Sequence, residues 1–89
     1  EKPNLPESVK TAEDFRDWMG DLSKKIYSKN KEIGEIARRI YNSAKKTIDS
    51  GSQNLINPNE QFDLFINLSL ELISKNDLYK LIRSTSGFN

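Results

Sequence analysis

The chain has 89 residues and a formal net charge of +1, which fit one small globular domain with no net attraction to nucleic acid or membranes. It contains neither cysteine nor histidine, so it offers no disulfide, no thiolate nucleophile and no imidazole base or metal ligand. This composition excludes most catalytic chemistry, and we expect a protein that is not an enzyme and holds no cofactor.

The first elements expected are an extended N-terminal arm over residues 1–10 and a helix over residues 12–28. Two prolines lie in the arm, and no helical periodicity is present there. Thr11 is a favourable N-terminal cap, and beyond it apolar residues recur every three or four positions. Gly20 lies inside this helix, where it indicates a close contact with another helix.

A second helix is predicted over residues 31–49, where isoleucine and alanine recur at helical spacing. Gly51 follows its end, and glycine adopts the left-handed conformation that closes a helix without steric cost. The small residues Ala37 and Ala44 lie on the apolar stripe of this helix, so a neighbouring helix can approach it closely.

The clearest local signal of a helix start is Asn57, followed by Pro58 at the first helical position and by Glu60 three residues after the cap. This third helix is predicted to run over residues 58–75. Because only a narrow stripe of it is polar, we expect it to be buried on most sides and to be the central element of the fold.

The chain is predicted to end in a short helix over residues 77–84, capped by Asn76 or Asp77, and a flexible tail over residues 85–89. These elements predict an all-α fold, a compact antiparallel bundle of three longer helices plus the short C-terminal helix, in a single domain over residues 11–84. The residues expected in its core are Phe15, Trp18, Leu22, Ile36, Ile40, Phe62, Phe65, Leu68 and Leu72.

Charge is unevenly distributed along the chain. Residues 22–46 carry a net charge of +6, whereas residues 1–21 carry −3 and residues 47–77 carry −4. The positive stretch covers the turn between the first two helices and the outer face of the second, where an anionic partner would meet several cations. The candidate partner-binding residues are Lys24, Lys25, Lys29, Arg38, Arg39, Lys45, Lys46 and Tyr41.

Three interpretations of this basic face are open. The leading function is a non-catalytic protein-interaction module, of a binding, inhibitory or immunity type, that engages an acidic segment of another protein. The alternative is a nucleic-acid-binding domain that uses the same face; few aromatic side chains lie near the cations, which disfavours it. The third and commonest interpretation of such a pattern is a face that is only solvated. Tyr27, Tyr41 and Tyr79 are the aromatic residues expected to be exposed for contacts.

Asp14, Asp17 and Asp21 share one face of the first predicted helix. A cation site usually draws its oxygen ligands from a tight loop or from two facing helices, so a solvated acidic face explains these residues better. No metal site is therefore expected.

The longest apolar-rich run, residues 62–73, is too short to cross a bilayer and contains polar side chains, so a soluble protein is expected. The sequence leaves the compartment open. A cytoplasmic location is favoured, and a processed secreted form is also compatible with a chain that starts at Glu1. The oligomeric state is not indicated.

The segment from Leu22 to Ile48, with its runs over residues 28–33 and 36–40, resembles the last helix pair of the N-terminal domain of transcription elongation factor S-II. This resemblance implies a helical bundle that docks short disordered peptides of transcription regulators. It covers about a third of the chain, and the tryptophan that such domains usually carry late in the second helix is absent. In length and outline, and in residues 78–82, the chain is also similar to small bacteriocin immunity proteins. No functional residue is carried over from either family.

Overall fold

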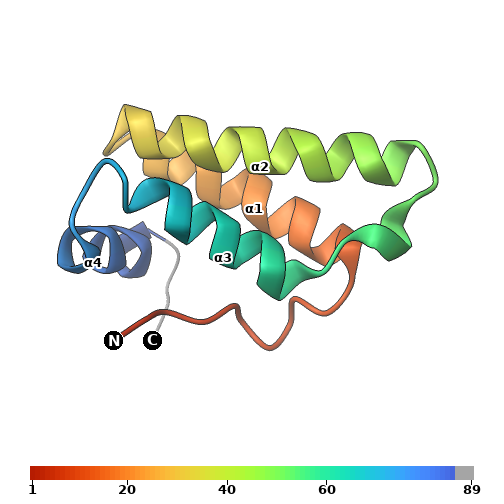
Figure 1. Ribbon diagram of the computed structural model, residues 1–89, viewed down its shortest axis with the longest axis horizontal. Helices are drawn as coiled ribbons and strands as arrows, with labels where there is room; N and C mark the ends of the chain where they lie inside the picture. The colour runs from red at the N-terminus through yellow and green to blue at the C-terminus, as the bar shows by residue number, and fades with distance from the viewer. Residues whose placement is uncertain (86–89) are drawn as a thin grey trace.

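The computed structural model describes residues 1–85, and over that range it contains α-helices, one turn of 3-10 helix and no strand (Figure 1). The predicted all-α fold is confirmed. Thr85 is the last residue of the final helix, so only residues 86–89 of the predicted tail lie outside the described residues. The elements are α1 (Ala12–Tyr27), α2 (Lys31–Asp49), the 3-10 turn η1 (Gln53–Leu55), α3 (Pro58–Ser69) and α4 (Lys75–Thr85).

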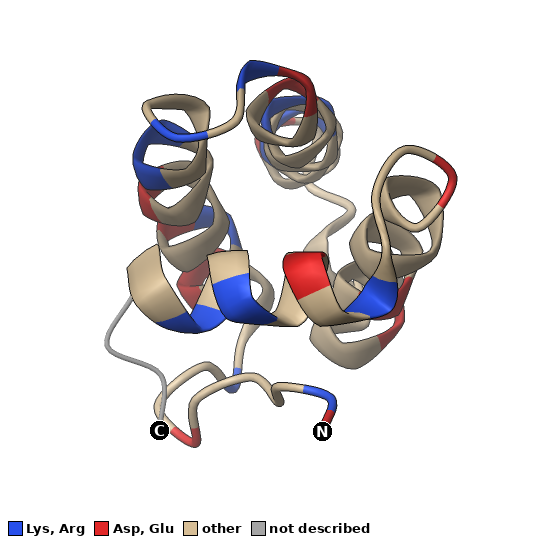
Figure 2. Ribbon diagram, turned by 90° about the vertical axis from the view of Figure 1, so that its left-hand side faces the viewer, with Lys and Arg blue, Asp and Glu red and all other residues tan. Residues whose placement is uncertain are grey.

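The first three helices alternate in direction to form an antiparallel bundle, and α4 lies across one end of it (Figure 1). α1 and α2 lie side by side, joined by a short turn, and α3 runs back along α2 (Figure 1). Viewed along these helices, α1, α2 and α3 form an arch, and α4 crosses beneath it (Figure 2). The core lies inside this arch, and the N-terminal arm runs below it, with Pro3 buried, Leu5 and Val9 packed against the core, and Lys2 paired with Asp63 of α3.

The first two helices each begin directly after a capping residue, Thr11 for α1 and Asn30 for α2. The Thr11 hydroxyl accepts a hydrogen bond from the Asp14 amide at 3.0 Å, and the Asp14 carboxylate accepts one from the Thr11 amide at 3.0 Å. This reciprocal capping box satisfies amides that the helix itself leaves unpaired, and the backbone hydrogen bonds lower the pKa of Asp14 below that of an ordinary aspartate. Asn30 caps α2 through the Ile33 amide. Gly51 follows the end of α2 with a φ of 83°, as the sequence predicts.

The start of α3 is also as predicted, and its cap can be tested by mutation. The Asn57 side chain accepts a hydrogen bond from the Glu60 amide at 3.2 Å, and Pro58 occupies the first helical position. We expect Asn57→Ala to lower the free energy of unfolding by about 1 kcal/mol, because an amide of the first turn loses its partner. Urea denaturation followed by circular dichroism measures this loss, and Asn59→Ala, in the same turn and exposed, is the matched control. An equal midpoint for the two variants would contradict the cap.

Most of the predicted core is confirmed. Six of the nine residues are buried, and they are joined by others from every helix. Trp18 is only partly buried; it packs on the rim of the core with its ring edge-to-face against Phe62, at a centroid distance of 5.5 Å. The six confirmed residues are Phe15, Leu22, Ile36, Ile40, Phe62 and Phe65.

The prediction that the third helix is central and buried on most sides is wrong. The helix-to-helix contact between α1 and α2 is the most extensive in the bundle. Only one face of α3 is buried, the face that carries Phe62, Phe65, Ile66 and Ser69. Leu68 and Leu72, predicted to be core residues, are 38% and 51% exposed. The reason is that an apolar helix is enclosed only where neighbours surround it, and α3 lies at the edge of the arch (Figure 2).

The third helix also ends earlier than predicted. The Ser69 hydroxyl donates to the Phe65 carbonyl at 2.8 Å, and the Leu72 amide donates to the Ser69 carbonyl at 2.9 Å, so the chain turns after α3. Ser74, not Asn76 or Asp77, then caps α4, since its hydroxyl accepts a hydrogen bond from the Asp77 amide at 3.1 Å. A serine followed three residues later by an acid is itself a capping pattern that the sequence displays.

Candidate functional site

The two longest helices approach each other so closely at two glycines that side chains are excluded there. A Cβ atom on Gly34 of α2 would lie 2.4 Å from the Cα of Tyr27, and one on Gly20 of α1 would lie 2.8 Å from the Tyr41 ring. The close contact predicted from Gly20 is confirmed. Because both glycines are buried at these contacts, the backbone itself forms the floor between α1 and α2.

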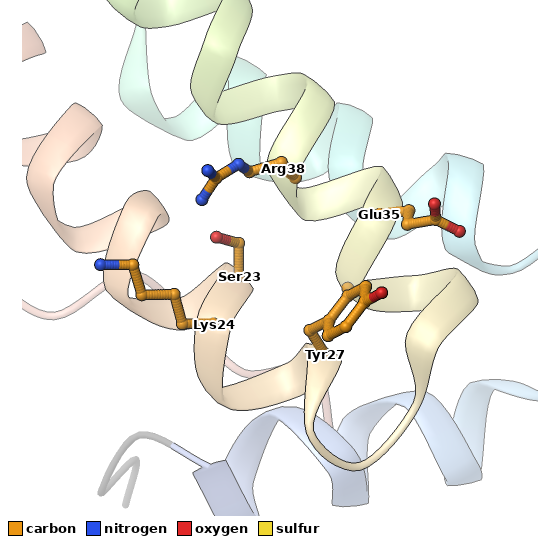
Figure 3. Close-up of a pocket in the computed structure, with 6 residues that line it drawn as sticks. Ser23, Lys24, Tyr27, Glu35 and Arg38 are labelled. Atoms are coloured by element: carbon orange, nitrogen blue, oxygen red, sulfur yellow. The ribbon is translucent and has the colours of Figure 1, made fainter.

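Above this floor lies a hollow of about 430 Å³. The Arg38 side chain extends from α2 toward α1, which carries Lys24 (Figure 3). The Glu35 carboxylate points away from the Arg38 guanidinium. The Ser23 hydroxyl is already engaged, because it donates to the Gly20 carbonyl at 2.7 Å. The hollow is lined by Ser23, Lys24, Tyr27, Gly34, Glu35 and Arg38.

A second hollow of about 220 Å³ continues the first along the same two helices. The two hollows share Lys24 and Arg38, so they form one depression, which we call the α1/α2 groove. The second hollow is lined by Asp17, Gly20, Asp21, Lys24, Arg38 and Tyr41.

The charges in the α1/α2 groove are unevenly neutralised. Asp17 is paired with Arg16 at 2.9 Å, and Asp21 is paired with Lys25 at 2.9 Å. No carboxylate within residues 1–85 comes within ion-pair distance of Lys24 or Arg38. The Arg38 guanidinium instead lies 5.7 Å from the centre of the Tyr41 ring. Lys24, Arg38 and Glu35 are therefore the charges of the groove outside any ion pair among residues 1–85, and the two cations are available to an anion from outside.

The structure brings three of the eight candidate residues together, namely Lys24, Arg38 and Tyr41, and separates the others. Lys25 is held by Asp21, and Lys45 is held by Asp49 at 3.0 Å.

Three more of the eight candidates lie away from the α1/α2 groove. Lys29 donates to the Ser84 hydroxyl at 3.2 Å and so ties the α1–α2 turn to α4. Arg39 lies on the other flank of α2, in a hollow shared with α3. Lys46 is exposed and lines neither hollow of the groove. The basic residues of the chain therefore do not form one continuous face.

The three tyrosines differ in exposure. Tyr27 is 48% exposed at the edge of the α1/α2 groove, and Tyr41 is partly buried within it. The prediction that Tyr79 is exposed is wrong: its ring is buried among the core residues of α4, with the Arg83 guanidinium 5.9 Å from its centre.

Sequence reasoning identified Gly20, Asp17 and Asp21 but missed Gly34 and Glu35, which also line the groove. Gly34 lies in the first turn of α2, and a glycine inside a helix costs up to about 1 kcal/mol relative to alanine and so signals a packing requirement. Gly20 and Gly34 together mark the line along which α1 and α2 touch.

In the described part of the chain, no cluster of three or more acidic side chains is arranged to hold a metal ion. None of the helices within residues 1–85 has the length and apolarity of a membrane-spanning segment. Comparisons with protein-family models, with curated proteins and with solved structures find no match to the chain. The resemblances seen in the sequence gain no support from these comparisons.

Proposed function

We propose that this protein is a non-catalytic interaction module that binds an acidic segment of another protein in the α1/α2 groove. The observation that carries the proposal is that Lys24 and Arg38, from two different helices, line the same hollow without a carboxylate partner. Two cations carried by two packed helices can recognise acidic side chains at a matching spacing.

The rest of the groove suits a peptide chain. The half-exposed ring of Tyr27 provides an apolar surface next to the cations. Apolar side chains of a bound segment can lie against this surface while its acidic side chains reach Lys24 and Arg38. Tyrosine and arginine, which the groove contains, are enriched in protein interfaces.

The same groove disfavours nucleic acid, the alternative partner. Three carboxylates, Asp17, Asp21 and Glu35, line the two hollows. A nucleic acid carries a charge on every phosphate and cannot avoid them, whereas a peptide places its acidic residues at discrete positions. The basic residues that would extend a phosphate track, Lys25 and Lys45, are already paired.

Charge reversal in the groove tests the proposal. The probe is a short, fluorescently labelled peptide in which glutamates are separated by single apolar residues, titrated by anisotropy. We expect Lys24→Glu combined with Arg38→Glu to weaken its binding about tenfold or more, mainly by slowing association, because both groove charges now repel the probe.

The matched control is Lys46→Glu combined with Lys80→Glu, which changes the net charge equally but lies outside the groove. This control should retain most of the binding. Equal losses in the two variants would show that only net charge matters, and no binding of the probe to the unmodified protein would also contradict the proposal. Preferential binding of a single-stranded oligonucleotide, with a steep dependence on salt, would replace it by the nucleic-acid alternative.

A further inference from the structure

A third hollow, separate from the two that form the α1/α2 groove, lies on the other flank of α2, between α2 and α3. It has a volume of about 230 Å³ and is lined by Ile36, Arg39, Leu68, Glu71 and Leu72. Leu64 lies one turn before Leu68 on α3 and is 43% exposed, so three leucines spaced four residues apart face outward along this edge. We call Leu64, Leu68 and Leu72 the leucine stripe. Clustered exposed leucines of this kind mark an interaction surface more often than leucines scattered singly.

The charges beside the leucine stripe are of opposite sign and lack partners. Arg39 comes from α2, and Glu71 comes from the turn that follows α3. Both line the hollow, yet the ion pairs formed within residues 1–85 do not include either of them. The surface therefore presents one cation and one anion across a small apolar area.

We infer that this face binds a second copy of the same chain. A two-fold axis that passes between Arg39 and Glu71 exchanges their positions. Each Arg39 then faces Glu71 of the other copy, and both pairs form at once, as a self-complementary interface requires. The leucine stripe of each copy then lies against the other copy and loses its contact with water. An acidic or a basic partner would leave one of the two charges facing its own sign, which is why a second copy fits best.

This surface is separate from the α1/α2 groove. Arg38 and Arg39 are adjacent in sequence, but they line hollows on opposite flanks of α2. In Figure 2, α1 and α3 lie on the two sides of α2, so a copy bound along α3 leaves the groove beside α1 open. The inference does not rest on the proposed function, and its test involves no peptide.

The test is sedimentation equilibrium of the full chain between roughly 10 μM and 1 mM, the range in which a small interface associates. We expect the unmodified protein to shift from monomer to dimer over this range. Arg39→Glu alone and Glu71→Arg alone should both remain monomeric, because each places like charges against each other in both contacts. An equimolar mixture of the two variants should form dimers again. In the mixed pair one contact joins the two substituted side chains with their charges exchanged, and the other contact keeps the original Arg39 and Glu71.

A leucine pair provides a control that does not involve charge. Leu68→Ser should abolish the dimer, whereas Leu55→Ser, at a residue that is 75% exposed and does not line the hollow, should leave it intact. Circular dichroism confirms that each variant is folded. A monomeric unmodified protein at the highest concentration, an undiminished dimer of either charge variant, or a monomeric mixture would each overturn the inference.

Discussion

Replacing Phe65 by alanine is expected to lower the free energy of unfolding by about 3 to 5 kcal/mol. The Phe65 ring is fully buried where α3 meets the core, with the Phe62 ring at a centroid distance of 6.2 Å. Truncation removes the ring and leaves a cavity that close-packed helices fill only in part. Because small domains have total stabilities of about 5 to 15 kcal/mol, the variant should begin to unfold at urea concentrations well below the unfolding midpoint of the unmodified protein. Urea denaturation followed by circular dichroism measures the difference.

The adjacent residue provides the control for this change. Leu64 precedes Phe65 on α3 but is 43% exposed on the outer side of the helix. Leu64→Ala should cost less than about 1 kcal/mol at concentrations where the chain is monomeric, because most of the removed surface already contacts water. Equal losses at the two positions would mean that α3 presents a different face to the core, and the leucine stripe would then be buried.

The second large effect is expected at Gly34. Alanine normally stabilises an exposed helix position by about 1 kcal/mol relative to glycine. Here the added methyl group would lie 2.4 Å from the Cα of Tyr27, a backbone atom that cannot move without shifting α1. We therefore expect Gly34→Ala to destabilise the protein by about 1 to 3 kcal/mol. It should also weaken binding of the acidic probe, because the added methyl group pushes α1 and α2 apart at the floor of the α1/α2 groove.

Gly20→Ala is the matched variant. Its methyl group would lie 2.8 Å from the end of the Tyr41 side chain, which can rotate away. Its loss of stability should be the smaller of the two, measured by the same urea denaturation. A Gly34→Ala variant that is more stable than the unmodified protein would contradict the close approach of α1 and α2.

The helices were predictable because their signals are local. Thr11, Asn30 and Asn57 stand next to the amides that they cap, so a few residues suffice to place the helix starts. The exposure of Leu68 and Leu72 was not predictable in this way. An apolar helix with a narrow polar stripe indicates burial, but the number of helices that cover it depends on where the chain turns, and the turn after Ser69 contains neither glycine nor proline.

The candidate site was predictable only in part for a related reason. Charge summed along the chain correctly locates the cations on α1 and α2, but it does not say which of them share a surface. Consecutive helix residues point about 100° apart, so Arg38 faces α1 while Arg39 faces α3. Ion pairs such as Lys45 with Asp49 then neutralise further cations.

The central claim, that the α1/α2 groove binds an acidic segment, is tested most directly by mapping backbone amide chemical shifts during titration with the acidic probe peptide. The account predicts that the largest changes fall on residues 20–27 of α1 and 34–41 of α2, and that the amides of Leu64 and Leu68 on α3 do not move. Changes concentrated on α3 or α4, or amides that stay unmoved at about 1 mM probe, would contradict it.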